Sequence, residues 1–180
     1  MKDFWKMILA TMLLNLVIAF LLPILAVFVQ NIGEKSVISI GYAFAASFIT
    51  QAFVSSYFGK LADKHGRRKF LILGNLIYCV VPFGYLLVTN LYQIIFLQII
   101  MGVGIGMSNP AYYALFSEKM KREKRGFGFG IFNSASALVI GIGALVGSSV
   151  VEFLGFQSLF LLMGIVQIFQ TFVIATVKEK

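Results

Sequence analysis

The stretch Gly59-Lys-Leu-Ala-Asp63-Lys-His-Gly66-Arg67-Arg68-Lys69 concentrates charge between two segments that carry none. Those segments, Val37–Phe58 and Phe70–Val88, consist mainly of apolar residues. An α-helix needs about 20 such residues to cross the hydrocarbon core of a bilayer. A charged stretch between two segments of that length predicts a connection that stays in water and joins two membrane-spanning helices.

The same alternation of apolar segments and charged connections continues along the chain. Apolar residues make up 59% of the 180 residues and charged residues only 12%, whereas a soluble domain carries about 25% charged residues. Strands of a membrane barrel would alternate apolar and polar residues, and these segments do not. The sequence therefore predicts an all-α membrane protein, a bundle of six transmembrane helices in a single domain, 1–180. The expected spans are Met7–Val29, Val37–Phe58, Phe70–Val88, Leu91–Phe116, Phe127–Val151 and Phe153–Val177.

Basic residues are distributed unevenly between the two sides of this predicted bundle. If the N-terminus is cytoplasmic, the outer connections hold only Lys35 of the 15 basic residues. Because cytoplasmic connections of membrane proteins are enriched in Lys and Arg, we expect a multi-pass protein of the cell membrane with both termini in the cytoplasm. This topology explains the net charge of +8 without nucleic-acid binding. Binding of anionic lipid headgroups by Lys119–Arg125 is the alternative reading of that segment.

Two prolines favour an internal repeat. Pro23 and Pro110 each lie six residues before the end of a predicted span, the first and the fourth, and they are 87 positions apart, close to half the chain. Interrupted helices at corresponding positions are typical of transporters built from two inverted repeats. Pro82 in the third span has no counterpart in the sixth. The sequence thus favours a 3+3 inverted repeat.

The charged stretch resembles the signature loop of the major facilitator superfamily, G-x-L-a-D-r/k-x-G-r/k-r/k. The residues that fit this pattern are Gly59, Leu61, Ala62, Asp63, Lys64, Gly66, Arg67 and Arg68. Other parts of the chain are similar to later helices of the family, so the resemblance extends over the whole sequence. They are Gly102, Gly104 and Gly106 in the fourth span, Arg125-Gly126 with Gly130, Asn133, Ser134, Gly141, Gly143 and Gly147 in the fifth, and Gly155–Phe160 at the start of the sixth.

The resemblance implies a fold, a partner and a gate. The family has twelve helices in two halves, so this chain would be the N-terminal half of that fold. Asp63 would lie at the cytoplasmic interface between the halves, and Arg67 would pair with the acid at the inner end of the fourth helix, here Glu118. We expect these contacts to favour the outward-open state, with Gly59, Gly66 and Arg68 in the same conformational gate.

Two positions depart from the family pattern. Gln98 stands where the family has a conserved arginine in the fourth helix, and Gly143-Ala144 replaces the Gly-Pro of the antiporter subgroups. Both departures argue against a proton-coupled drug antiporter.

Neutral polar residues near mid-depth are the candidates for a substrate cavity. None of the six predicted spans contains Lys, Arg, Asp or Glu, and such residues are the usual markers of proton and ion paths. For each neutral candidate the alternative is a hydrogen bond between helices. The resemblance favours substrate contact on the first and fourth helices, because these face the family's central cavity. The candidates are Asn15, Gln51, Gln98, Asn109 and Tyr112.

Four glycines are predicted to serve helix packing. Gly143 and Gly147 form a small-xxx-small pair that allows close approach of a neighbouring helix, and Gly102 and Gly106 have the same spacing. The lone His65 and the absence of a His, Cys or carboxylate cluster predict neither an enzyme nor a metal or cofactor site.

The sequence therefore predicts membrane transport of a small solute by alternating access. In this hypothesis the chain supplies one six-helix half of a twelve-helix transporter, paired with a second copy or with a complementary half. One alternative is an inactive N-terminal fragment of a full-length transporter. The other is a non-transporting membrane protein that assists assembly or binds a partner.

Overall fold

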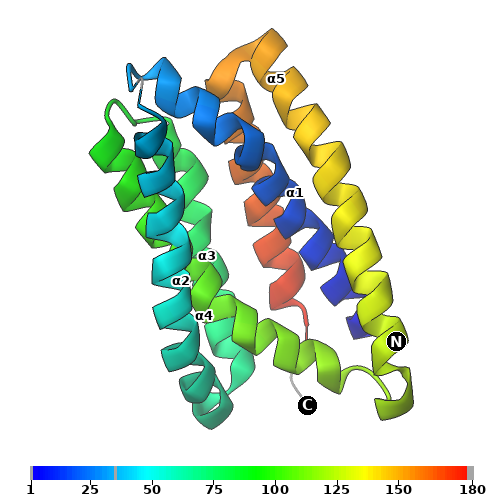
Figure 1. Cartoon of the computed structure of the whole chain (residues 1–180). Helices are drawn as coiled ribbons and strands as arrows, with labels where there is room; N and C mark the ends of the chain where they lie inside the picture. The colour runs from blue at the N-terminus through cyan, green and yellow to red at the C-terminus, as the bar shows by residue number, and fades with distance from the viewer. Residues whose placement is uncertain (1, 35, 178–180) are drawn as a thin grey trace.

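The computed structural model describes residues 2–34 and 36–177, which form helices joined by short turns. Figure 1 shows these helices running up and down beside one another. The elements are α1 (Lys2–Asn31), α2 (Val37–His65), α3 (Arg67–Tyr85), α4 (Leu91–Glu118), the short 3-10 helix η1 (Arg122–Lys124) and α5 (Arg125–Ala175). Lys35, predicted for the outer side, and Lys178 and Lys180, predicted for the inner side, lie outside the described residues.

The charged stretch is helical almost throughout and turns at a single residue. α2 continues past its apolar part to His65, and α3 begins at Arg67. Gly66 between them has φ 98°, a left-handed value that residues with a side chain rarely adopt, and its N–H donates to the Ala62 carbonyl at 3.1 Å. α1, α2 and α4 extend beyond the predicted spans, because the apolar segments mark only the part of a helix suited to lipid, whereas α3 ends at Tyr85, before the predicted Val88.

The predicted spans 127–151 and 153–177 form one element, α5. Its backbone leaves helical geometry only at Gly155, with φ 80° and ψ 170°. The chain reverses direction there without an intervening loop, so that a first arm, residues 125–154, and a second arm, residues 156–175, run in opposite directions (Figure 1). Glycine permits this turn because the conformation is almost closed to other residues.

The prediction of a six-helix bundle is wrong. The described residues form five α-helices, and four helical segments among them are long and apolar enough to cross a membrane: 3–31, 37–65, 91–118 and 122–175. The last two predicted spans fall in one element because no loop separates its two arms, which meet at Gly155. α3 falls short because its 19 residues begin with Arg67, Arg68 and Lys69. The 3+3 inverted repeat required six helices and is withdrawn with them.

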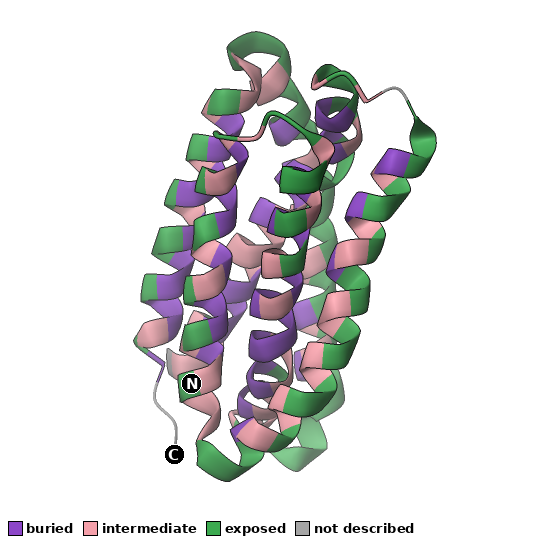
Figure 2. Cartoon of the chain, turned by 90° about the vertical axis from the view of Figure 1, so that its left-hand side faces the viewer, coloured by how far each residue is buried: buried purple, intermediate pink, exposed green. Residues whose placement is uncertain are grey.

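The helices pack in two groups joined by α3. α2 and α3 both pack against α4, α1 packs against α5, and α3 also contacts α5. α1 and α4 make little direct contact. Buried residues face the interior of the bundle, whereas its outer surface is apolar and exposed, as on Phe53, Phe153 and Phe172 (Figure 2). An apolar exterior around an all-helical body is that of a multi-pass membrane protein.

One end of the bundle carries most of the basic residues. The start of α1, the α2–α3 turn, the segment between α4 and α5, and the end of α5 all lie at this end (Figure 1). Arg68 donates from Nη2 to the Ala175 carbonyl at 2.7 Å, and Lys6 Nζ lies 3.5 Å from the Thr176 carbonyl. We call it the basic end.

Candidate functional site

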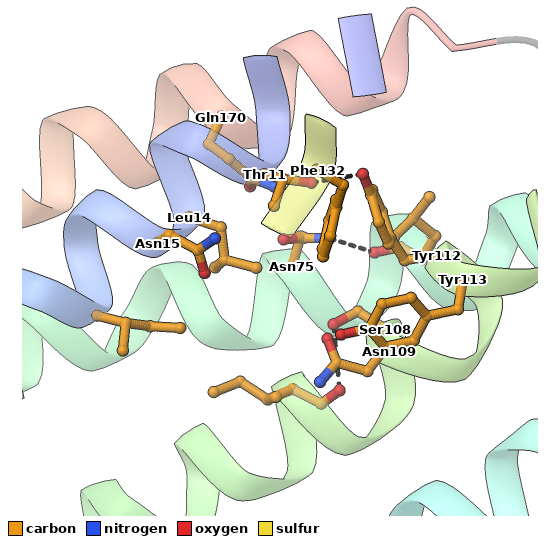
Figure 3. Close-up of a pocket in the computed structure, with 13 residues that line it drawn as sticks. Thr11, Leu14, Asn15, Asn75, Ser108, Asn109, Tyr112, Tyr113, Phe132 and Gln170 are labelled. Atoms are coloured by element: carbon orange, nitrogen blue, oxygen red, sulfur yellow. Dashed lines mark hydrogen bonds between the residues drawn. The ribbon is translucent and has the colours of Figure 1, made fainter. Parts of the chain in front are cut away.

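A polar cavity of about 100 Å³ lies where α1, α3, α4 and both arms of α5 meet (Figure 3). Polar side chains from four helices line it, and none of the lining residues is an acid or a base. The residues are Thr11, Leu14, Asn15, Ile18, Leu71, Asn75, Ile105, Ser108, Asn109, Tyr112, Tyr113, Phe132 and Gln170. The cavity therefore offers hydrogen bonds without charge.

Asn15 from α1 and Asn109 from α4 provide the cavity's free hydrogen-bonding groups. Both side chains are half-buried. Within the described part of the chain, neither carboxamide makes a hydrogen bond (Figure 3). A carboxamide has two donor hydrogens and an acceptor oxygen, so these two residues can bind a neutral partner from opposite helices.

Two further carboxamides at the cavity are held by protein groups. Asn75 on α3 donates from Nδ2 to the Leu71 carbonyl at 2.7 Å. Gln170 on α5 accepts at Oε1 from Gln167 Nε2 at 3.3 Å, and the Thr171 hydroxyl lies 3.4 Å from the same oxygen. Asn75 and Gln170 are both buried. These two side chains make the cavity wall polar, and their hydrogen bonds to protein groups fix their orientation.

Tyr112 closes the cavity toward the basic end. Its hydroxyl lies 3.1 Å from the Met7 carbonyl oxygen and hydrogen-bonds with the Thr11 hydroxyl. Its ring stacks on Phe116 with centroids 5.7 Å apart. This contact joins α4 to the first turns of α1, as does the stacking of Phe4 on Phe116 with ring centroids 5.3 Å apart.

Gln98 lies elsewhere, in the wall of a second cavity of about 280 Å³ between α1, α2, α3 and α4. The surface of this cavity is wholly apolar, and Leu21, Leu25, Phe44 and Met101 contribute to it. Gln98 is fully buried, and neither its Oε1 nor its Nε2 has a partner within the described structure. Of the predicted cavity residues, the polar cavity thus brings together Asn15, Asn109 and Tyr112 but not Gln98.

Gln51 lines neither cavity and lies at a helix contact. It is half-buried on α2, where a Cβ built on Gly106 would lie 3.0 Å from its carbonyl oxygen. A Cβ on Gly102 would lie 2.5 Å from the Ser47 carbonyl oxygen of the same helix. Gly102 and Gly106 therefore sit where α4 and α2 approach most closely.

Gly143 and Gly147 occupy the corresponding place between α5 and α1. A Cβ on Gly143 would lie 2.7 Å from Ala19 Cβ, and one on Gly147 would lie 2.9 Å from Phe20 Cα. Gly59 is less confined, since a Cβ there would lie 3.5 Å from Pro110 Cβ, an ordinary van der Waals distance.

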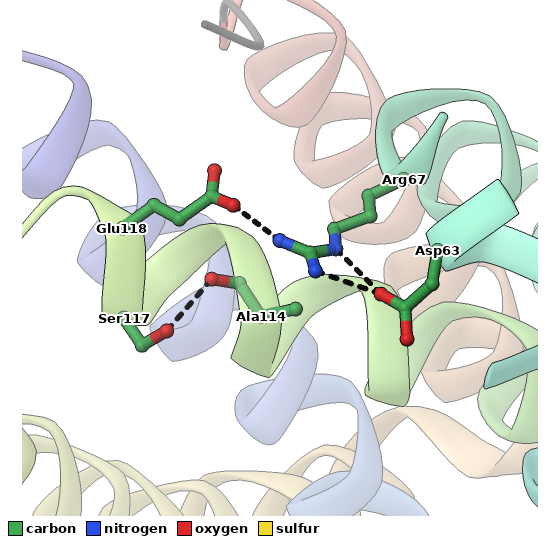
Figure 4. A network of polar contacts seen from close by, with 5 residues as sticks. All are labelled: Asp63, Arg67, Ala114, Ser117 and Glu118. Carbon is green, nitrogen blue, oxygen red and sulfur yellow. Dashed lines mark hydrogen bonds and ion pairs between the residues drawn. The ribbon is translucent and has the colours of Figure 1, made fainter. Parts of the chain in front are cut away.

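A charged network at the basic end connects three helices (Figure 4). Arg67 donates from Nε and Nη2 to Asp63 Oδ1 at 2.9 and 2.7 Å, and its Nη1 donates to Glu118 Oε1. The hydrogen bond to Asp63 raises the pKa of Arg67 above its ordinary value, with the charge of Glu118 acting in the same direction. A single guanidinium thus ties the end of α2 and the start of α3 to the end of α4.

A second ion pair at this end was not anticipated from the sequence. Lys119 Nζ lies 3.8 Å from Asp3 Oδ2, which connects the end of α4 to the start of α1. The Lys119 side chain is only 9% exposed. Together with the Arg67 network, this contact brings α1, α2, α3 and α4 to one another at the basic end.

Five polar residues of the polar cavity were missed by sequence reasoning: Thr11, Asn75, Ser108, Tyr113 and Gln170. Each is a neutral polar residue within an apolar segment, as Asn15 and Asn109 are. The available signal was helical spacing, because Thr11, Asn15 and Ile18 follow one another at intervals of four and three residues on one face of α1. Within the described residues no group of three His, Cys, Asp or Glu side chains could hold a metal ion.

Comparison with known proteins places this geometry in context. The sequence model of the Major Facilitator Superfamily matches residues 7–178. The chain is 31% identical over 150 residues to the multi-drug resistance efflux pump PmrA of Streptococcus pneumoniae, an alignment that covers 82% of this chain and 37% of that protein. It is 26% identical over 150 residues to the multidrug resistance protein MdtG of Proteus mirabilis, covering 81% and 37%. The chain thus spans little more than a third of these curated relatives.

Two solved structures share the fold. The crystal structure of an auto-inhibited POT family peptide transporter superposes with a TM-score of 0.76 over 97% of this chain and 36% of that one, at 19% identity. The POT family transporter PepTSo gives a TM-score of 0.74 over 96% and 36%, at 14% identity.

Proposed function

Because the chain belongs to the Major Facilitator Superfamily, we propose that it supplies one bundle of a two-bundle transporter that moves a small solute across the membrane by alternating access. The observation that carries this proposal is the polar cavity, where Asn15 and Asn109 lie on α1 and α4 with unpaired carboxamides. Unpaired polar groups inside a membrane protein are costly. A solute that alternates with water at these groups gives them partners.

The charged network is proposed as the conformational gate at one end of the cavity. Asp63 and Glu118 hold Arg67 from α2 and α4, on the basic side of Tyr112. We propose that α4 moves relative to α2 and α3 when the cavity opens toward the basic end, and that this movement breaks the Arg67–Glu118 pair. Gly66, with its left-handed backbone, and Arg68, bonded to Ala175, are proposed to belong to the same gate.

The second bundle is proposed to cover the exposed faces of α2 and of the first arm of α5. Gly130, Asn133, Ser134, Ala137 and Gly141 are all exposed on that arm, and small residues with an occasional amide are typical of helix contacts within membranes. The partner is a second copy of this chain or a complementary bundle. The relatives, of which the chain spans little more than a third, are long enough to contain one.

The basic end is proposed to face the cytoplasm, with the protein in the cell membrane. Lys60, Lys64 and the segment Lys119–Arg125 all belong to the basic end, where α1 begins and α5 ends. This arrangement agrees with the enrichment of basic residues on the cytoplasmic side of membrane proteins.

Two-sided labelling of one cavity residue tests alternating access. In a Cys79→Ser background, Asn15→Cys is expected to react with a membrane-impermeant methanethiosulfonate in both right-side-out and inside-out vesicles. Phe172→Cys is the matched control, because residue 172 is exposed on the outer apolar surface of α5 and should stay unlabelled in lipid. Labelling of Asn15→Cys from one side only, or from neither, would count against transport by this bundle.

The partner is tested by the mass of the purified chain in nanodiscs. Self-pairing predicts a dimer that Ser56→Cys, exposed on α2, crosslinks in the same background, whereas Leu161→Cys, exposed on the second arm of α5, does not crosslink. A monomer under these conditions would rule out self-pairing and leave a complementary bundle as the partner.

A further inference from the structure

The two cavities share a wall. Ile18 lines both the polar cavity and the apolar one. The lining residues of α1 extend from Thr11 to Leu25, and those of α4 from Gln98 to Tyr113. Because the two linings follow one another along both helices and share Ile18, the cavities lie end to end between α1 and α4, with the Ile18 side chain in the wall common to both.

The polar end of this space suits an uncharged group. Its wall contains carboxamides, hydroxyls and phenols but no acid or base. An ion placed there would exchange its hydration for neutral dipoles alone, which is unfavourable in a membrane interior. A hydroxyl or amide loses less hydration and can pair with the unpaired carboxamides of Asn15 and Asn109.

The apolar end suits a hydrocarbon ring or chain. Its surface is wholly apolar, and its volume is about 280 Å³. An apolar cavity of about 150 Å³ in another protein stays dry and binds benzene, so a phenyl ring fits here. Leu22 and Phe48 line this cavity and are also 50% and 65% exposed, so its mouth lies between α1 and α2.

We propose, resting on the transport function above, that the solute is an uncharged amphipathic molecule that binds across both cavities. Its hydroxyl or amide head contacts Asn15 and Asn109, and its apolar body passes Ile18 into the second cavity. The polar cavity thus selects against a charged head, and the apolar cavity selects for a hydrocarbon body.

A series of compounds with one skeleton separates these requirements. The probe is tritiated 4-phenyl-1-butanol, bound to the purified chain in nanodiscs and corrected for binding to empty nanodiscs. The competitors are 4-phenylbutylamine, which is a cation, 4-phenylbutyrate, an anion, and butylbenzene, which has no head group. The alcohol is expected to bind more tightly than either ion by roughly 100-fold, and more tightly than butylbenzene by about threefold to tenfold.

Variants then assign the head and the body to their cavities. Asn15→Leu and Asn109→Leu should each reduce the alcohol's preference over butylbenzene by about threefold to tenfold. Asn31→Leu is the matched control, because Asn31 is exposed at the end of α1 and lines neither cavity. Ser47→Phe, which places a ring in the second cavity, should weaken the alcohol and butylbenzene alike.

Three results would overturn the proposal: equal or tighter binding of an ion, equal affinity for the alcohol and butylbenzene, or a preference that survives both Asn→Leu variants. The second result would indicate that the space takes any hydrocarbon, a lipid chain included. The affinities of the four ligands are compared on the unmodified chain. This comparison stays decisive even if a variant misfolds. Binding is also independent of two-sided labelling, so failure here and failure of the transport proposal are distinguishable.

Discussion

The Tyr112 hydroxyl hydrogen-bonds with the Thr11 hydroxyl across the base of the polar cavity, so that one buried contact joins α4 to α1. Both residues are less than 9% exposed. The Met7 carbonyl oxygen lies 3.1 Å from the same Tyr112 hydroxyl. One turn closer to the basic end, Phe4 of α1 stacks on Phe116 of α4 with ring centroids 5.3 Å apart.

A double-mutant cycle measures this contact. Tyr112→Phe and Thr11→Val should each lower the free energy of unfolding, and their coupling energy should be about 0.6 kcal/mol, the average for hydrogen bonds between membrane helices. The measurement is denaturation of the purified protein in mixed micelles. Pairing Tyr112→Phe with Ser149→Ala on α5 should give no coupling, because the Ser149 hydroxyl, within the described structure, bonds only to the Leu145 carbonyl of its own helix. Zero coupling between Thr11 and Tyr112 would show that the hydrogen bond contributes nothing to the α1–α4 contact.

The Arg67 network should control conformation more than stability. The Asp63 side chain is 64% exposed, and exposed ion pairs contribute about 0–1 kcal/mol. Asp63→Asn is therefore expected to change the free energy of unfolding by less than about 1 kcal/mol. The same substitution should speed the labelling of Asn15→Cys from the basic side, because the gate is then open more often. Lys64→Gln, one position away and exposed, is the control. Unchanged labelling in Asp63→Asn would remove the gate from the proposal.

Two glycines on α5 should respond oppositely to alanine. A Cβ on Gly147 would lie 2.9 Å from Phe20 Cα, an atom of the α1 backbone, so Gly147→Ala must separate the helices. We expect a loss of about 1–3 kcal/mol in the free energy of unfolding. Gly141→Ala meets nothing within 4 Å and should be neutral or slightly stabilising, since alanine favours the helix. Equal effects of the two substitutions would argue against close α1–α5 packing at Gly147.

The reversal of α5 depends on the backbone of Gly155. Its φ of 80° with ψ of 170° lies in a region open essentially to glycine. Gly155→Ala should lower the free energy of unfolding by about 1–3 kcal/mol through backbone strain alone, because a Cβ there meets nothing within 4 Å. Gly130→Ala, also unobstructed but in helical backbone, is the comparison. A tolerated alanine at 155 would show that the turn has an alternative geometry.

The buried carboxamide of Gln98 should be a source of instability. Both of its polar atoms are buried without a partner in the described structure, and each such atom costs about 1–3 kcal/mol. Gln98→Met, similar in length and apolar, is expected to raise the thermal midpoint of unfolding. Gln167→Met, at another fully buried glutamine, should raise it less, because only the Oε1 of that amide lacks a partner and the substitution also breaks the hydrogen bond from its Nε2 to Gln170. A lowered midpoint for Gln98→Met would mean that a water or a solute pairs with the amide.

Local features of the sequence predicted the class of the protein and part of the site. Apolar segments without charge indicated helices in lipid, and the order of residues around Asp63 and Arg67 pointed to the family to which the chain belongs. The pairing of Arg67 with Glu118, 51 positions later, followed from the family resemblance and not from any periodicity. The selection of Asn15, Asn109 and Tyr112 followed from their polarity at mid-depth, but Gln98 and Gln51 satisfied the same criterion and lie outside the polar cavity.

The number of helices was misjudged because hydropathy measures composition rather than backbone geometry. Glu152 interrupts the apolar residues of α5 and suggested the end of one helix and the start of another. A charged residue can remain helical when it lies outside the lipid, and only the dihedral angles of Gly155 reveal where the chain turns. At α3 the error was different: the sequence placed Arg67, Arg68 and Lys69 in a connection before the span Phe70–Val88, whereas these three residues form the first turn of the helix.

By itself, then, the sequence determined an all-helical membrane protein with its basic residues gathered at one end, because both properties depend on which residues occur and in what order. The tertiary structure alone decided that Asn15 and Asn109 face one cavity, that Ile18 separates it from an apolar one, and that Lys119 reaches Asp3. These relationships depend on how helices are rotated and spaced against one another. That spacing is set by close contacts such as those of Gly102 and Gly147, which no single segment of the chain contains.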